Sequence, residues 1–211
     1  MNAARGRLVI VNPNTNARVT LWLAEEARRV AGTAIEVIAV NAESGIEAIE
    51  TPEHLEIAAR AVASEVAKHR GASGAVVAGF GDPGVEEAQA LGLMPVAGLG
   101  KSGMSAAALG GRRFSIVTLG MAMREPILAK AASLDLASQL AEVLVLPFSI
   151  AEMVRDRDAA LAEILRAVRA VRMAPCYWAE PRSRAWRPAS RWRRGGSCST
   201  ASRPASKRSS V

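Results

Sequence analysis

The arrangement of the apolar segments constrains the fold more than any other feature of this sequence. Short segments such as 7–11 (RLVIV) are apolar at consecutive positions after their first residue, without alternating polar residues. Such strands are buried on both faces, which is typical of a parallel sheet that is covered by helices on each side. Because helical patterns separate the runs, the sequence predicts an α/β fold with parallel sheets. The predicted strands are 7–11, 34–40, 74–78, 95–99, 114–119 and 143–147.

Helical periodicity and capping signals fill the segments between these strands. Thr51, Pro52 and Glu53 form a strong helix start, with Thr51 as the N-cap and Pro52 in the first turn. The predicted helices are 17–31, 52–70, 85–91, 102–109, 124–134, 137–141 and 158–171. Ligands of parallel sheets bind at the carboxyl ends of the strands, so the loops that follow the strands are the candidate site.

The first candidate loop comprises residues 12–16 (NPNTN), between a strand and a helix. Backbone N–H groups at a helix N-terminus, together with amide and hydroxyl side chains, suit a carboxylate or another small anion. Asn12, Asn14 and Thr15 are therefore candidate substrate-binding residues. Simple capping of the following helix is the alternative interpretation of this loop.

The second candidate loop comprises residues 79–84 (GFGDPG). Its glycines allow a ligand to approach the backbone closely, so Gly79, Phe80 and Gly81 are candidate binding residues. Asp82 is the candidate catalytic base, although an Asp before a Pro can instead cap the short helix that follows, at 85–91. Thr118, at the end of a later strand, completes the candidate set.

No cofactor and no metal are expected. The segment 98–103 (GLGKSG) lacks the spacing of a phosphate-binding loop, and the two histidines have no ligand partner at metal spacing. No apolar run is long enough to span a membrane and no signal-peptide core is present, so we expect a cytoplasmic protein. A small-molecule substrate is the expected partner, and a homo-oligomer is compatible with the sequence.

The basic character of the chain is concentrated at its C-terminus. Residues 173–211 hold nine basic residues and one acidic residue, which leaves a net charge of −1 on the first 172 residues although the whole chain carries +7. Both cysteines and three of the four tryptophans also lie there, and the strand and helix periodicity stops. Taken as written, this segment is a disordered basic tail.

Four ordered motifs resemble the aspartate/glutamate/hydantoin racemase family, with the hydantoin and allantoin racemases as the most similar branch. They are 8–15 (LVIVNPNT), 76–84 (VVAGFGDPG), 95–100 (PVAGLG) and 112–118 (RRFSIVT). The resemblance implies two similar α/β lobes around a cleft, with the second lobe incomplete here. We expect lobes at 1–98 and 99–172, followed by the basic low-complexity segment 173–211.

The same resemblance implies a reaction, which is proton exchange at a carbon beside a carbonyl. In this family two thiols face opposite sides of that carbon, one accepting and one donating the proton. This chain has Gly79 at the first thiol position and no cysteine before Cys176. The sequence therefore predicts a racemase or isomerase relative without both family thiols, and a non-catalytic binder of small carboxylates or ureides is the alternative.

The genetic code indicates that the tail is read out of frame. If the third base of each codon is joined to the first two of the next, Cys176-Tyr177-Trp178 must read Leu-Leu. Met173-Ala174 and Trp178-Ala179 must each read Gly. With GC-rich codons the shifted frame reads GAVLLGGAALAGLA, a buried strand followed by a glycine-rich loop, again with Gly at the family's second thiol position. A nucleic-acid-binding tail, with Arg and Trp contacting phosphates and bases, is the competing and less favoured explanation.

Resequencing the gene from about codon 160 to beyond the stop codon tests the frame. We expect an insertion or deletion near codon 172 that restores the second lobe and removes the basic tail. A confirmed frame would contradict this prediction and would make a binding role, or loss of function, the better explanation.

Overall fold

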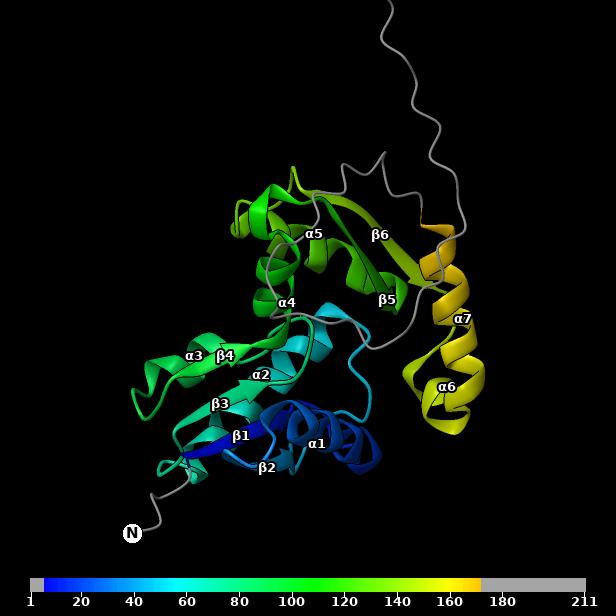
Figure 1. The fold of residues 1–211 in the computed structure, drawn as a ribbon. Helices are drawn as coiled ribbons and strands as arrows, with labels where there is room; N and C mark the ends of the chain where they lie inside the picture. The colour runs from blue at the N-terminus through cyan, green and yellow to red at the C-terminus, as the bar shows by residue number, and fades with distance from the viewer. Residues whose placement is uncertain (1–5, 172–211) are drawn as a thin grey trace, which may run out of the picture. The chain divides into compact units, whose positions relative to one another are not determined.

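The computed structural model describes residues 6–171 and contains two parallel sheets in that range (Figure 1). The larger sheet has the strand order β2-β1-β3-β4, and all of its pairings are parallel. The smaller sheet consists of β5 and β6, which are also parallel. The strands are β1 (Gly6–Asn12), β2 (Ile35–Asn41), β3 (Gly74–Val77), β4 (Val96–Gly98), β5 (Phe114–Leu119) and β6 (Leu140–Leu146).

Helices connect successive strands, as parallel pairing requires. Local signals start several of them: Asn16 caps α1, Thr51 caps α2 with Pro52 in the first turn, and Asp156 caps α7. The helices are α1 (Ala17–Ala31), α2 (Pro52–Lys68), α3 (Val85–Ala90), α4 (Leu99–Ala107), α5 (Arg124–Ser133), α6 (Ile150–Arg155) and α7 (Arg157–Ala170), with 3-10 turns at Leu109–Gly111 and Met121–Met123. Within the described residues, no helix has the length and apolarity that crossing a membrane would need.

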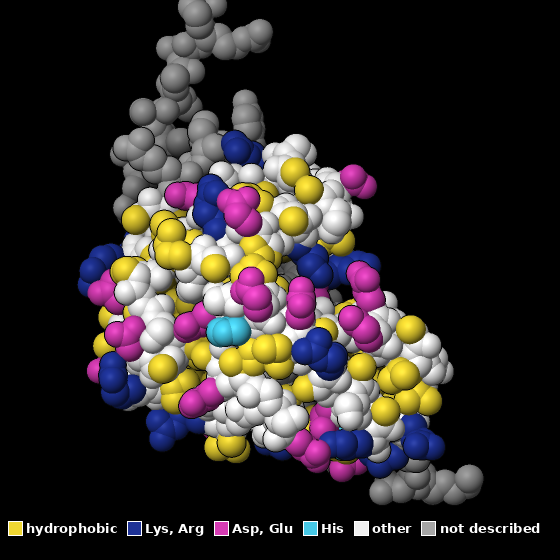
Figure 2. All heavy atoms as spheres, turned by 180° about the vertical axis from the view of Figure 1, so that it is seen from behind, with side chains coloured by type: hydrophobic (Ala, Val, Ile, Leu, Met, Phe, Trp, Pro, Cys, Tyr) yellow, Lys and Arg dark blue, Asp and Glu magenta, His cyan; other side chains and the backbone are white. Residues whose placement is uncertain are grey.

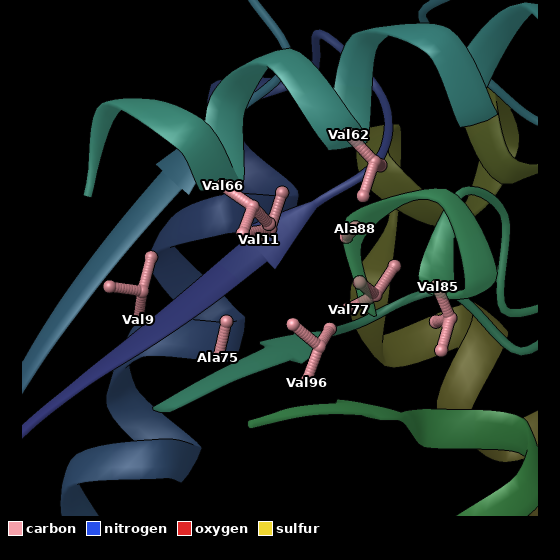
Figure 3. Packing of buried hydrophobic residues seen from close by; sticks show 9 residues of the cluster. All are labelled: Val9, Val11, Val62, Val66, Ala75, Val77, Val85, Ala88 and Val96. Atoms are coloured by element: carbon pink, nitrogen blue, oxygen red, sulfur yellow. The ribbon is translucent and has the colours of Figure 1, made fainter. Parts of the chain in front are cut away.

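A valine-rich core fixes the larger sheet. Val9 and Val11 of β1 face Val62 and Val66 of α2, and Figure 3 shows α2 and α3 on one side of the strands with α1 on the other. These four side chains are fully buried. Full burial of a side chain of this size stabilises the fold by about 1.5–3 kcal/mol. The consecutive apolar residues of β1 are therefore explained by helices on both of its faces.

A second core lies on one face of the smaller sheet. It contains Phe114 and Ile116 of β5, Val143 of β6, and side chains of the flanking helices such as Met104 of α4 and Ile127 of α5. Met104 and Ile127 are almost completely buried. The chain between 99 and 146 thus has its own apolar centre, distinct from that of the larger sheet.

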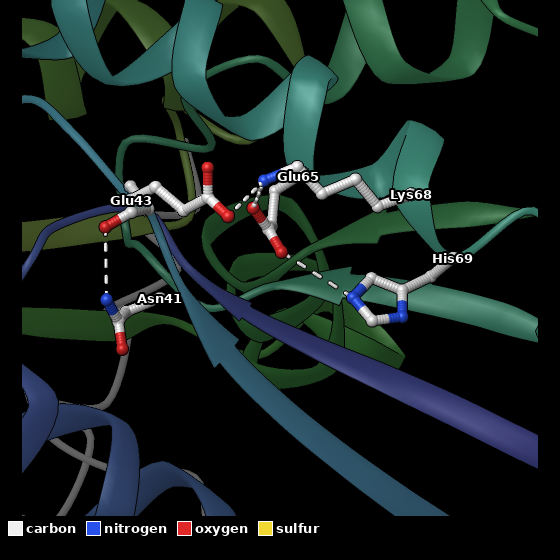
Figure 4. A network of polar contacts seen from close by, with 6 residues as sticks. Asn41, Glu43, Glu65, Lys68 and His69 are labelled. Atoms are coloured by element: carbon white, nitrogen blue, oxygen red, sulfur yellow. Dashed lines mark hydrogen bonds and ion pairs between the residues drawn. The ribbon is translucent and has the colours of Figure 1, made fainter.

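A buried carboxylate is held near the end of α2. The Glu65 side chain is 8% exposed and accepts a hydrogen bond from Lys68 Nζ at 2.8 Å, while His69 Nε2 lies 3.5 Å away (Figure 4). Lys68 also pairs with Glu43 at 2.7 Å, and hydrogen bonds to Glu43 and Glu65 raise the pKa of Lys68 above its ordinary value. Pairing of this kind is what allows a charged group to be buried.

The α/β fold with parallel sheets is confirmed, and every strand predicted from the sequence is present. The largest difference in strand limits is in β6, which begins at Leu140 rather than at residue 143. The predicted helix 137–141 is wrong: residues 137–139 form a turn, and Gln139 O accepts from Phe114 N beside the start of β6. The chain leaves α5 through Asp135 in the left-handed region at φ 57°, and a single turn, in which Leu136 O accepts from Gln139 N and Leu140 N at 3.0 Å each, leads directly into the strand.

One helix was not predicted, and one prediction falls outside the described range. α6 was missed, although Ser149 and Glu152 form a capping box at its start. The hydrogen bonds from the Ser149 backbone and hydroxyl hold the pKa of the Glu152 carboxyl below its usual value. The predicted disorder and frame error at 173–211 concern residues outside those that the structure describes.

Gly84 offers a test of how tightly α3 is packed on α2. Its φ is +74°, and an added Cβ would lie 2.5 Å from Ala59 O and 2.9 Å from Val62 Cβ. We expect Gly84→Ala to lower the free energy of unfolding by roughly 2–5 kcal/mol, through left-handed strain and overpacking together. Urea unfolding monitored by circular dichroism would measure this.

Gly92→Ala is the matched control, because Gly92 has φ +63° but nothing within 4 Å of an added Cβ. Only the backbone strain of roughly 1–2 kcal/mol should remain there. Equal losses in the two variants would show that the packing of Gly84 against α2 is not a constraint.

Candidate functional site

The loop after β1 is organised by a buried amide. Asn12 is 1% exposed, and its Nδ2 lies within hydrogen-bond distance of Asn14 Oδ1 (2.9 Å), Thr20 Oγ1 (3.0 Å) and Asn16 O (3.2 Å). Its Oδ1 accepts from Asn14 N at 3.3 Å. Asn12 therefore shapes the loop from within, with both of its side-chain polar atoms bonded inside the loop and to α1.

The Asn14 amide uses its oxygen for hydrogen bonds within the loop, whereas its nitrogen makes none to the described residues. Asn14 Oδ1 accepts from Asn12 Nδ2 and from Asn16 N at 2.9 Å. No acceptor among the described residues bonds to Asn14 Nδ2, and no buried side-chain atom in this part of the chain lacks a partner. Asn14 Nδ2 thus makes no hydrogen bond to the described residues, in a residue that is 7% exposed as a whole.

The backbone of Thr15 and the side chain of Asn16 hold the shape of this loop. Thr15 N donates to Ile46 O at 3.0 Å, which ties the loop to the segment after β2. Asn16 Oδ1 accepts from Arg18 N and Val19 N and so caps α1. The capping interpretation is thus correct for Asn16, and it leaves the Asn14 amide and the Thr15 hydroxyl as the side-chain donors of this loop that remain for a ligand.

Close contacts surround the glycines of the loop after β3. A Cβ at Gly79 would lie 2.6 Å from Pro13 Cγ, so the ring of Pro13 occupies the place of a side chain. A Cβ at Gly81 would collide with Leu55, and one at Gly100 would collide with the carbonyl oxygen of Phe80. At Gly100 the contact is with backbone, so packing within the chain requires glycine there. At Gly79 and Gly81 a side chain would fit only if the Pro13 ring or the Leu55 side chain moved.

Asp82 joins three elements through one buried carboxylate. Its oxygens accept from Gly100 N at 2.6 Å and from Lys101 N at 2.8 Å, in the first turn of α4, and Lys130 Nζ of α5 lies 3.3 Å away. The Asp82 side chain is 3% exposed, and the residue adopts φ +54°. A carboxylate here stabilises the positive end of the α4 dipole.

The predicted capping of the short helix by Asp82 is corrected by this arrangement. α3 has Gly84 at its N-cap position and no side-chain cap, whereas Asp82 caps α4 instead. The cause is the close approach of residues 98–101, because glycine at 98 and at 100 leaves room for the Asp82 carboxylate and the Phe80 carbonyl.

Thr118 lies at the end of β5, where its Oγ1 donates to Leu119 O at 3.3 Å. Two residues further on, an added Cβ at Gly120 would be 3.2 Å from Glu50 O. Glu50 Oε1 also accepts from Ile150 N at 2.9 Å, at the start of α6. The strand-end loops of the two sheets are therefore connected through Glu50.

α6 is held at both ends by side chains of opposite charge. Glu50 accepts from its first backbone N–H, and Arg18 Nη1 donates to Val154 O at 3.0 Å near its last turn. Both charges complement the helix dipole. None of the six residues of α6 is fully buried, so these end contacts contribute to holding the helix in place beside its packing on α7.

A cleft of about 520 Å³ lies beside the Asp82 carboxylate. Charged side chains of both signs line it, and Figure 2 shows acidic and basic groups interspersed on the face seen from behind. Asn12, Asn14, Thr15 and Thr118 are not among its lining residues. Among residues 6–171, no three His, Cys, Asp or Glu side chains are grouped closely enough to hold a metal ion.

Comparison with known proteins identifies the class to which this fold and these loops belong. The model of the Asp/Glu/hydantoin racemase family matches residues 8–176, and the chain belongs to this family. It is 25% identical to a hydantoin racemase of Pseudomonas sp. (strain NS671) over 162 residues, covering 76% of this chain and 65% of that protein. It is 24% identical to a hydantoin racemase of Paenarthrobacter aurescens, covering 77% of this chain and 70% of that protein.

Two solved structures share the fold. An allantoin racemase from Klebsiella pneumoniae superposes with a TM-score of 0.72 at 26% identity, over 80% of this chain and 70% of that one. An allantoin racemase from Pseudomonas fluorescens gives a TM-score of 0.72 at 29% identity, over 76% and 69% of the two chains. The match thus spans about two thirds of the length of these relatives.

Sequence reasoning missed three residues that shape the candidate site. Lys130 lies beside the Asp82 carboxylate, and Glu50 accepts a hydrogen bond from Ile150 N. The third residue is Pro13, whose ring lies against Gly79. Pro13 was within the recognised loop, and its packing on Gly79 follows from the adjacency of β1 and β3. Lys130 is 48 residues from Asp82 in the sequence, and Glu50 is 100 residues from Ile150, so no local pattern marks either contact.

Asp82→Asn tests the cap on α4. The introduced amide can accept through its single oxygen only, and its NH₂ group would then face the second backbone N–H. We expect the free energy of unfolding to fall by about 1–3 kcal/mol. The measurement is urea unfolding of this variant and of Lys130→Met. Lys130→Met should lose less unfolding free energy, because both hydrogen bonds from the α4 backbone to Asp82 remain. Wild-type stability in both variants would contradict this role of Asp82.

Proposed function

We propose that this chain is a racemase or isomerase that exchanges the proton on the carbon beside a carbonyl in amino-acid derivatives such as hydantoins. The observation that carries the proposal is the Asn14 amide, whose Nδ2 makes no hydrogen bond to the described residues, at the carboxyl end of a parallel sheet in a member of the Asp/Glu/hydantoin racemase family. Ligands of parallel sheets bind at such strand ends. For this reason we place the substrate there rather than in the cleft beside Asp82.

In this proposal the substrate's carboxylate or imide oxygen accepts a hydrogen bond from Asn14 Nδ2. The Thr15 hydroxyl and the backbone of Gly79, Phe80 and Gly81 supply further polar contacts, with Thr118 from the other sheet. Asn12 supports Asn14 from the buried side. A donor that is fixed by a buried network keeps its orientation when substrate binds, which lowers the entropic cost of binding.

Asp82 as a proton carrier stays a prediction. Its two oxygens already accept from α4, and Lys130 lies beside them, so substrate can reach the carboxylate only if one of these partners moves. If Asp82 carries the proton, Asp82→Asn abolishes exchange and Lys130→Met does not. If Asp82 only positions the loop, both variants reduce exchange in proportion to their loss of stability.

A non-catalytic binder of small carboxylates or ureides is the second candidate function. The glycine at position 79, where the family has its first thiol, favours it, because glycine cannot transfer a proton. Thermal stabilisation by a hydantoin or an amino acid, without turnover, would support this alternative.

Deuterium wash-in at the α-carbon of a panel of hydantoins and amino acids, followed by mass spectrometry, tests the proposed activity. The chain as written and a frame-restored chain should both be assayed against a heat-denatured control. We expect the active protein to incorporate deuterium above that control. Asn14→Asp, which replaces the Nδ2 donor with an oxygen but keeps the acceptor for Asn12 Nδ2 and Asn16 N, should lower the rate about tenfold or more. Absence of exchange in both chains over the whole panel would eliminate the racemase proposal.

A further inference from the structure

The short helix α6 is anchored beside the loop that holds Asn14. Arg18, which contacts its last turn, comes two residues after that loop, at the start of α1. Glu50, which contacts its first residue, belongs to the segment whose Ile46 O accepts from Thr15 N. Because α6 follows β6, it reaches from a strand end of the smaller sheet to the strand ends of the larger one. Ligands of parallel sheets bind at this edge.

α6 depends on other segments to remain helical. It has six residues, none of which is fully buried. A capping box of Ser149 and Glu152 closes its first turn, and α7 packs beside it. Helices shorter than about 12–15 residues are marginal in water when they are isolated. Contacts with the rest of the chain are therefore needed, and the two at the ends of α6 come from the segments that form the larger sheet.

Glu50 supplies the contact at the start of α6. Its Oε1 accepts from Ile150 N at 2.9 Å, a first-turn N–H that the capping box does not use. The backbone of Glu50 is itself held, because its N donates to His54 Nδ1 at 3.2 Å and its carbonyl oxygen lies against Gly120. A negative charge at this end also complements the positive end of the helix dipole.

Two residues of α1 supply the contacts at the other end. Arg18 Nη1 donates to Val154 O at 3.0 Å. One turn further along α1, the centre of the Trp22 ring lies 5.0 Å from Arg157 Cζ, a separation at which a cation and an aromatic ring attract each other. Arg157 is the first residue of α7, so this contact holds the junction between α6 and α7.

We propose that α6 is a lid on the loop 12–16, and that Glu50 and Arg18 form a latch that holds it at both ends. Within the described residues neither side chain forms an ion pair, so the ends of α6 are the partners of both charges. Loss of either contact weakens the whole of this short helix rather than one end. The latch is independent of catalysis, whereas the role as a lid rests on the site of the proposed function.

Hydrogen exchange of the full 211-residue chain, resolved to single amides by mass spectrometry, tests the latch. The reporters are the amides of Met153 and Asp156, each hydrogen-bonded to the carbonyl four residues earlier. In Glu50→Ala we expect both amides to exchange about fivefold faster or more, and the same in Arg18→Ala. Alanine is a good helix former, so the second variant does not weaken α1 itself. Unchanged exchange in β1 would show that the larger sheet is intact.

Arg155→Ala is the matched control for these variants. Arg155 lies in the last turn of α6, but it pairs only with Glu152, at 4.0 Å on the exposed surface. Exchange in this variant should stay within about twofold of wild type, because exposed ion pairs contribute little. Faster exchange only at the end nearest to each substitution would indicate fraying and would overturn the latch. Unchanged exchange in both the Glu50 and the Arg18 variant would overturn it as well.

Labelling of an introduced thiol tests the role as a lid. Thr15→Cys places a thiol in the loop after β1, and mass spectrometry of the fragment that contains residue 15 separates its reaction with iodoacetamide from that of Cys176 and Cys198. We expect labelling about fivefold faster or more when Glu50→Ala or Arg18→Ala is added. Equal labelling rates would overturn the lid. Absence of deuterium wash-in would count against the racemase activity only, because neither measurement depends on turnover.

Discussion

The buried carboxylate of Asp82 is the interaction on which the arrangement of the candidate site depends. It belongs to the loop after β3, it accepts from the first turn of α4, and it lies beside Lys130 of α5. One side chain thus connects the last segments of the larger sheet to the helices that cover the smaller one. The cost of burying a charge is offset here by two amide donors and an ammonium group, and the helix dipole adds to the stabilisation.

The glycines around Asp82 follow from this connection. Gly98 and Gly100 leave space for its carboxylate and for the Phe80 carbonyl, and Gly84 lets α3 begin against Ala59. A ligand was the first explanation for the glycine-rich loop, but most of these glycines are explained by contacts inside the chain. The candidate ligand donor is instead the Asn14 amide, in the neighbouring loop.

Local and long-range features were not equally predictable from the sequence. The strands, the Thr51 cap and the Asn12–Asn16 loop were recognised because each depends on residues within a few positions of one another. α4 was predicted to begin at residue 102, three residues late, because its cap comes from Asp82, 18 residues away. The helix predicted at 137–141 failed for a related reason: pairing of β6 with β5 overrides the local preference of a short segment.

The packing of Pro13 on Gly79 sets a requirement on any side chain that is introduced at position 79. A cysteine there would have its Cβ 2.6 Å from Pro13 Cγ. This separation is shorter than real Cβ contacts, so the proline ring or the backbone of the first loop must move to admit the side chain. Restoring a thiol at this position therefore requires an adjustment of the loop after β1 as well as a codon change.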